Sequence, residues 1–279
     1  MMPGERLRIN KTSNTTRTAL ELYSQNNCYM RIGDDIESIV SSVDISKLDP
    51  ANRLTLESSI RLILVTAFQL VECLPDALAV RGVLNRVDWK YALDLPMGHL
   101  GITAFDLCRF RQDLFSSKTA LKEFGRLLNH FRAVNLFPSN PGLRMNPVDA
   151  VITICLVNRN YALHEARKAI LNLLITTESE GAVRSIGSCW YDRYKIGPLT
   201  PSVYPSIDDL KKENARIRSD IQQLVLLVHN YKNSSVSDRM ESLTTDRSLK
   251  GGFTVVDDQL QWDLPACDPS VCVLQLADI

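Results

Sequence analysis

One segment restricts the possible folds of this chain more than any other. Residues 52–73, NRLTLESSIRLILVTAFQLVEC, combine a long apolar stretch with helical periodicity. The apolar positions at helical spacing are Leu56, Ile60, Ile63, Phe68 and Val71. Since so little of the segment is polar, the sequence predicts a helix that is largely buried, and therefore a folded core around it.

Further segments have helical character and are shorter or more polar. They are residues 17–24, 76–84, 102–115, 118–137, 159–177 and 208–231. The turn cluster Pro138–Pro141 separates them into two groups. The sequence therefore predicts a mainly α protein, with a helical domain over residues 17–138 and a second, mostly helical region over 142–231. The polar, aperiodic ends, residues 1–16 and 232–279, are expected to be disordered.

The charge of the chain is balanced in total and uneven along its length. The 279 residues hold 32 Lys and Arg against 32 Asp and Glu, so net charge alone does not favour a nucleic-acid partner. Residues 81–132, however, carry nine Lys and Arg against five Asp and Glu, whereas residues 240–279 carry two against seven. A basic middle segment and an acidic tail follow from these counts.

The cysteines and the apolar runs indicate a compartment. Seven cysteines, of which only Cys267 and Cys272 lie close together, are typical of a reducing compartment rather than a disulfide framework. The N-terminus is polar, and no run approaches the roughly 18 apolar residues of a membrane span. We therefore expect a soluble, cytoplasmic protein that has no membrane partner.

Short motifs add information that periodicity does not contain. Residues 86–95 read RVDWKYALDL, and the following helix contains Leu107 and the pair Phe110-Arg111. Upstream of them stand Asn27, Tyr29 and Arg31, then Leu74 and Asp76; downstream stand Asn158-Arg159 and the run WYDRY at 190–194. In this order they resemble the InsH-type N-terminal region of bacterial insertion-sequence transposases. The chain departs from that pattern at Cys28, Asp94 and Phe105, where the family has proline, glycine and commonly serine.

The resemblance implies DNA binding by the helical N-terminal domain. Five basic residues around its central motif are then expected to meet phosphates: Arg81, Arg86, Lys90, Arg109 and Arg111. The alternative is a basic face that is merely solvated. Trp89 and Tyr91 are interpreted as packing residues rather than base contacts.

The resemblance also implies a particular nuclease chemistry. Transposases of this type have an RNase-H-like α/β core in which two Asp and one Glu hold two Mg²⁺ ions for phosphodiester cleavage. The segment that should carry the first Asp, at the start of a β-strand, is Arg144–Val151, and Asn146 occupies the Asp position. Asp149 is a weak substitute, because an offset of three in a strand places it on the opposite face.

The rest of the catalytic set is not found in the sequence. The tail does not resemble the continuation of the family, so the second and third carboxylates are expected to be missing. We therefore expect a truncated, degenerate member of the family: no intact catalytic residue, no bound metal although intact members use Mg²⁺, and DNA, the ends of an insertion sequence, as partner, with a homodimer possible.

Two alternatives remain open. One is a helical protein-interaction module without DNA function, with the 208–231 helix as the contact surface. The other is a residual active transposase in which another carboxylate, such as Asp149, replaces the lost ligand.

Overall fold

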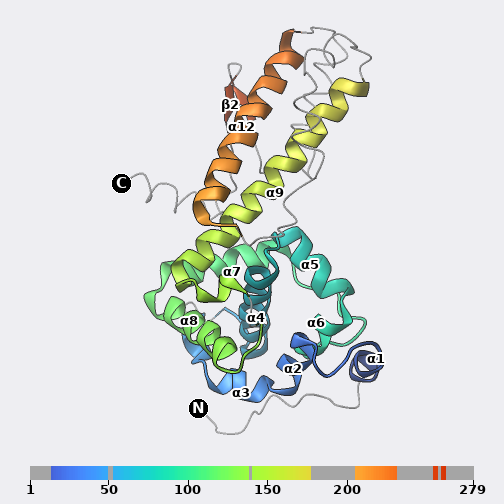
Figure 1. The fold of residues 1–279 in the computed structure, drawn as a ribbon, viewed down its shortest axis with the longest axis vertical. Helices are drawn as coiled ribbons and strands as arrows, with labels where there is room; N and C mark the ends of the chain where they lie inside the picture. Colours follow the sequence, from blue (N-terminus) through green and yellow to red (C-terminus); the bar gives the residue numbers. More distant parts are fainter. Residues whose placement is uncertain are drawn as a thin grey trace. The chain divides into compact units, whose positions relative to one another are not determined.

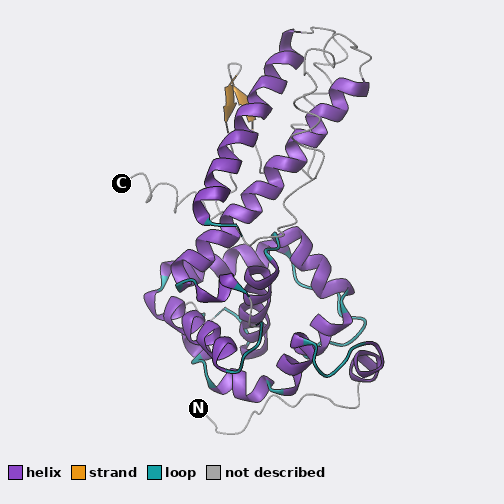
Figure 2. Ribbon diagram, in the orientation of Figure 1, coloured by secondary structure: helices purple, strands orange, loops and turns teal. Residues whose placement is uncertain are grey.

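The computed structural model describes residues 14–49, 53–137, 140–176, 205–230, 254–256 and 259–261. The chain divides into two compact units, residues 1–154 and 155–279, which are described separately. The described residues are mainly α-helical, as expected from the sequence (Figures 1 and 2). The expected lead-in and tail lie largely outside the described residues. Within them, Asn14–Thr16 already belong to a helix, and two short strands lie at 254–256 and 259–261.

The first unit is built from short helices. In chain order these are α1 (Asn14–Leu22), α2 (Cys28–Asp34), α3 (Ile36–Ser41), the 3-10 turn η1 (Ile45–Lys47), α4 (Leu56–Glu72), α5 (Asp76–Asn85), α6 (Val87–Ala92), α7 (Ala104–Ser116), α8 (Lys118–Ala133), the 3-10 turn η2 (Pro141–Arg144) and the beginning of α9 (Pro147–Thr176). Side-chain caps define several starts. Asn27, Thr55, Thr103 and Ser117 each accept a hydrogen bond from a backbone N–H in the first turn of the helix that follows.

Helix α4 lies at the centre of this unit, among α5, α7 and the two 3-10 turns (Figure 1). Its residues from Ser59 to Val71 are buried with the single exception of Arg61. The helix ends at Cys73, whose φ of 53° is left-handed. The expectation of a largely buried helix is confirmed. Among the residues that the structure describes, no single helix is long and apolar enough to cross a membrane, and only α4 and α5 together, bent by 113°, pass by length and composition.

An aromatic cluster joins α4 to α6, the helix that lies within the RVDWKYALDL motif of residues 86–95. The ring centroid of Phe68 lies 4.9 Å from that of Tyr29 and 5.1 Å from that of Trp89. Trp89 is fully buried, and Gly82 of α5 lies against its indole ring, where a Cβ atom would come within 2.9 Å of Cζ3. Trp89 is thus a packing residue, as expected from the sequence.

The stretch expected to enter a β-strand is helical instead. Helix α9 runs without interruption from Pro147 to Thr176, so the apolar segment 150–157 and the expected helix 159–177 form one element. Pro147 is suited to the first position of a helix, and Asn146 stands before it with its side chain bonded to the first turn. The strand was expected from the resemblance, which places the first Asp of the family at the start of a strand, and this expectation is wrong. Within helix α9, the residues from Val151 to Val157 are buried, except for Ile152, which is partly exposed.

The second unit contains the rest of α9, helix α12 (Ile207–Asn230) and a two-stranded antiparallel hairpin of β1 (Thr254–Val256) and β2 (Gln259–Gln261). The Asn160 amide donates to Asn214 Oδ1 at 3.0 Å, and Asn214 Nδ2 donates to the Leu156 carbonyl at 3.2 Å, which joins the two helices. The buried apolar side chains of α12 are Leu210, Ile217, Ile221 and Leu224. This hairpin is the only sheet in the described ranges, which therefore show no RNase-H-like sheet.

Candidate nucleic-acid interface

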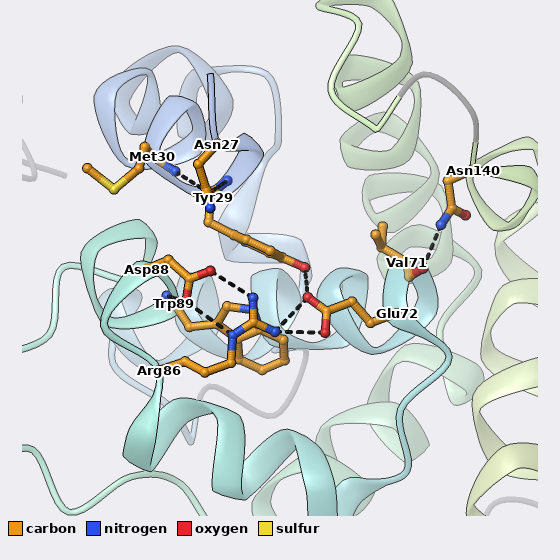
Figure 3. Close-up of polar contacts among 9 residues, drawn as sticks. All are labelled: Asn27, Tyr29, Met30, Val71, Glu72, Arg86, Asp88, Trp89 and Asn140. Carbon is orange, nitrogen blue, oxygen red and sulfur yellow. Dashed lines mark hydrogen bonds and ion pairs between the residues drawn. The ribbon is translucent and has the colours of Figure 1, made fainter. Parts of the chain in front are cut away.

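Arg86, one of the five residues expected to meet phosphates, is held by two carboxylates (Figure 3). It lies between α5 and α6. Its Nη1 donates to both carboxylate oxygens of Glu72 at 2.7 Å, while Nη2 and Nε donate to Asp88 at 2.7 and 3.1 Å. The guanidinium also lies 4.9 Å from the ring centroid of Tyr29 and 4.8 Å from that of Trp89. Its positive charge is balanced inside the protein.

The electrostatics of this cluster raise the pKa values of Tyr29 and Arg86. The Tyr29 hydroxyl donates to Glu72, and both burial and the Glu72 charge raise the pKa of Tyr29 above its usual range. Burial lowers the pKa of Arg86, but the hydrogen bonds and charges of Asp88 and Glu72 outweigh burial, so the net shift is upward. Tyr29 therefore stays a neutral donor and Arg86 a cation at every physiological pH.

Arg111 and Lys90 are also turned inward. Arg111 is 1% exposed, and its guanidinium forms a bidentate pair with Asp76, with Nη1 2.7 Å from Oδ1. Gln69 of α4 donates to the same Asp76 oxygen at 2.7 Å. Lys90 is 5% exposed and its ammonium donates to the carbonyl of Met97. These contacts stabilise the fold and leave little of either cation for a phosphate.

Only Arg81 on α5 and Arg109 on α7 are exposed among the five predicted DNA contacts. The basic segment 81–132 thus contains two kinds of cation, which its composition does not distinguish. Arg86, Lys90 and Arg111 are committed to internal contacts. Arg81 and Arg109 are the members of the set that a phosphate can reach.

Residues from separate parts of the motif meet at the end of α4. Tyr29, Arg86, Asp88 and Trp89 gather around Glu72, and Asp76 and Arg111 gather around Gln69, less than one turn away on the same helix. Asn27 caps the helix that carries Tyr29, and Asn140 donates to the Val71 carbonyl beside this cluster (Figure 3). Six of the positions that match the transposase pattern therefore lie in these two clusters: Tyr29, Asp76, Arg86, Asp88, Trp89 and Arg111.

Glu72 and Gln69 were missed by sequence reasoning, although they hold both clusters. The available signal was their position, because they are polar side chains near the end of an otherwise apolar, buried helix. A buried polar group needs a partner, so such positions predict partners elsewhere in the chain.

Asn146 and Asp149 face each other rather than lying on opposite sides. Asn146 Oδ1 accepts from the Asp149 backbone N–H at 2.9 Å, and Asn146 Nδ2 donates to Asp149 Oδ2 at 2.5 Å. The expectation of opposite faces assumed a strand and is wrong, because residues three apart lie on the same side at the start of a helix.

Within the described ranges, no group of three or more His, Cys, Asp or Glu residues is arranged to hold a metal ion.

The WYDRY run at 190–194 and the cysteines 267 and 272 lie outside the described residues. No family model, no curated protein and no solved structure matches the chain. A functional assignment therefore depends on the residues of the first unit and on their contacts.

Proposed function

We propose that this chain is a transposase-like DNA-binding protein of an insertion sequence that has no nuclease activity. One observation carries the proposal. Tyr29, Asp76, Arg86 and Arg111, which come from four motif segments spread over more than 80 residues, form two adjoining polar clusters around α4. Chance matches to a motif would have no reason to converge in space, whereas positions that a family needs for its fold would do so.

The same contacts divide the proposed roles between residues. Arg86, Lys90 and Arg111 stabilise the helical domain, and Arg81 and Arg109 contact phosphates. Residues 142–231 would correspond to the start of an incomplete RNase-H-like catalytic region, in which Asn146 stands in place of the first metal-binding carboxylate. Asp149 is the one carboxylate of residues 144–151, and it is bonded to the uncharged amide of Asn146, whereas the chemistry needs three carboxylates.

The alternative role as a protein-interaction module is less well supported. It depends on the apolar face of the 208–231 helix being free for a partner. Leu210, Ile217, Ile221 and Leu224 of that face are each 0% exposed within the chain itself. A homodimer and a cytoplasmic location remain part of the proposal, and light scattering of the purified protein measures the first of these.

DNA binding is tested with duplexes taken from either side of the protein's own reading frame. We expect a mobility shift at low salt that weakens as salt is added, because phosphate contacts release counterions. The double variant Arg81→Ala/Arg109→Ala should reduce the slope of log K against log salt by about two. Lys168→Ala/Arg216→Ala is the matched control, since it removes two exposed cations that are paired with Glu165 and Glu213.

Two results would contradict the proposal. The absence of a shift at low salt would exclude DNA binding. Cleavage of the duplex with Mg²⁺ or Mn²⁺, abolished by Asp149→Ala, would show that nuclease activity remains and that Asp149 serves as a ligand.

A further inference from the structure

Three large apolar side chains are exposed where α5 ends and α7 begins. Leu84 is 42% exposed, Phe105 is 55% exposed and Leu100, in the loop that leads from α6 to α7, is 94% exposed. Figure 2 shows this loop in teal between α6 and α7. Side chains this accessible add little to the stability of the fold by burial. Three exposed apolar side chains between the end of α5 and the start of α7 are typical of a binding surface.

The loop that carries Leu100 approaches α5 at Leu84, and α7 with Phe105 begins shortly after it. Gly101 has a φ of 88°, and a Cβ atom at Gly101 would lie 3.9 Å from Leu84 Cβ. Leu100 directly precedes this contact. Phe105 follows Leu100 by five residues, which limits the distance between their backbones to about 18 Å. Leu84, Leu100 and Phe105 are called the apolar surface below.

Two exposed arginines flank the apolar surface. Arg81 lies three residues before Leu84 on α5, and Arg109 lies four residues after Phe105 on α7, so each shares a helix face with its apolar neighbour. The acid next to Phe105, Asp106, accepts hydrogen bonds from the Thr103 backbone and hydroxyl at the start of α7. Its carboxylate is therefore engaged in a capping box, where the helix N-terminus favours negative charge.

We propose that the apolar surface packs against unstacked bases of bound DNA while Arg81 and Arg109 hold the phosphates on either side of it. This inference rests on the proposed function and deepens it by naming the contact. The flanking arginines favour a polyanion, and bases that leave the stack expose apolar faces on which aromatic and aliphatic side chains pack. The whole surface is smaller than one turn of duplex DNA, about 34 Å, so a single bound site engages it at once.

The test uses the full chain and a duplex with 2-aminopurine at a mismatched position, whose fluorescence rises when the base unstacks. The variant Leu100→Ser/Phe105→Ser should bind this duplex at least about fivefold more weakly and lose the fluorescence rise, because one base contact of this kind is worth that much. The slope of affinity against salt should not change, since no charge is removed. Leu56→Ser/Val148→Ser is the matched control: both side chains are exposed and stand next to Glu57 and Asp149.

The outcomes separate this inference from the proposed function. If Leu100→Ser/Phe105→Ser binds like the wild type while Arg81→Ala/Arg109→Ala loses affinity, the base contact is overturned and DNA binding stands. If no form of the protein binds DNA at low salt, the proposed function fails, and the inference fails with it. Wild-type binding to anionic vesicles or self-association that the serine variant abolishes, without any change in DNA binding, would assign the surface to a lipid or to a second copy instead.

Discussion

The guanidinium of Arg111 on α7 and the carboxylate of Asp76 on α5 form a bidentate ion pair in the interior of the first unit. Both residues belong to motif positions that resemble transposases, and Gln69 of α4 bonds to the same pair. The contact joins three helices at one point. A cation that composition alone would assign to DNA therefore stabilises the fold.

Arg111→Ala should destabilise the protein strongly. Removing one partner leaves the Asp76 charge poorly compensated in a protected site, a change that costs about 3–5 kcal/mol. Urea denaturation followed by circular dichroism measures the change in the free energy of unfolding. Arg109→Ala, on the exposed face of the same helix, should change it by less than about 0.5 kcal/mol. Equal effects of the two substitutions would show that the pair has no structural role.

Gly82→Ala should destabilise the protein although alanine is the better helix former. Alanine gains about 1 kcal/mol over glycine inside a helix, but its Cβ would lie 2.9 Å from Trp89 Cζ3 in the closed core. Overpacking of this kind costs about 1–3 kcal/mol, so we expect a net loss. Gly98→Ala is the control, since nothing lies within 4 Å of a Cβ atom there. The thermal unfolding midpoints of the two variants give the comparison.

Placing an aspartate at position 146 should not create a nuclease. Asn146→Asp keeps the oxygen that accepts from the Asp149 N–H but replaces the amide that donates to the Asp149 carboxylate. Two like charges then meet at the start of α9, and we expect the free energy of unfolding to fall by about 1 kcal/mol at neutral pH. Isothermal titration with Mg²⁺ and a DNA cleavage assay check for activity. Metal-dependent cleavage by this variant would refute the expectation.

The pair Asn160 and Asn214 should show strong coupling. Either single leucine variant leaves the other amide buried with one partner fewer, at a cost of about 1–3 kcal/mol. The double variant removes both polar groups and should be nearly neutral or stabilising, as in helix pairs where a buried Asn sets the register at the expense of stability. A double-mutant cycle by urea denaturation measures this, and additive single effects would exclude the coupling.

His164 should remain neutral well into the acidic range. Burial lowers its pKa to about 4, assisted by the positive charges of Arg167, Lys168 and Arg216 and opposed by Glu165. The unfolded chain binds a proton near pH 6.5, so stability is complete above that pH and falls between about 6.5 and 4. At about 1.4 kcal/mol per pKa unit, the loss is at most about 3.5 kcal/mol.

Nuclear magnetic resonance titration of the His164 ring tests the shift directly. The ring should be uncharged at pH 5. His164→Gln should make the free energy of unfolding less dependent on pH between 4 and 6.5. A normal His164 titration near pH 6.5 would contradict the expected burial.

Much of the helical content follows from local patterns that the sequence shows directly. The apolar periodicity of residues 52–73 requires a buried helix, and Asn27, Thr55 and Thr103 start their helices through side-chain caps that depend only on neighbours in the chain. Likewise, an uncharged residue at 146 is readable without any structure. These features are local, and local interactions are encoded within a few residues.

Tertiary structure alone decided which charged side chains form ion pairs within the fold. Arg81 and Arg86, five residues apart, are indistinguishable in composition, yet one is exposed and the other lies between Glu72 and Asp88. The choice between strand and helix at residues 147–157 was also undecided locally, because a β-branched run fits either element until its surroundings are known. The partner of a buried charge, or the covering of an apolar run, comes from residues far away in the sequence. For that reason only the folded chain could separate the cations that hold it together from those left for a ligand.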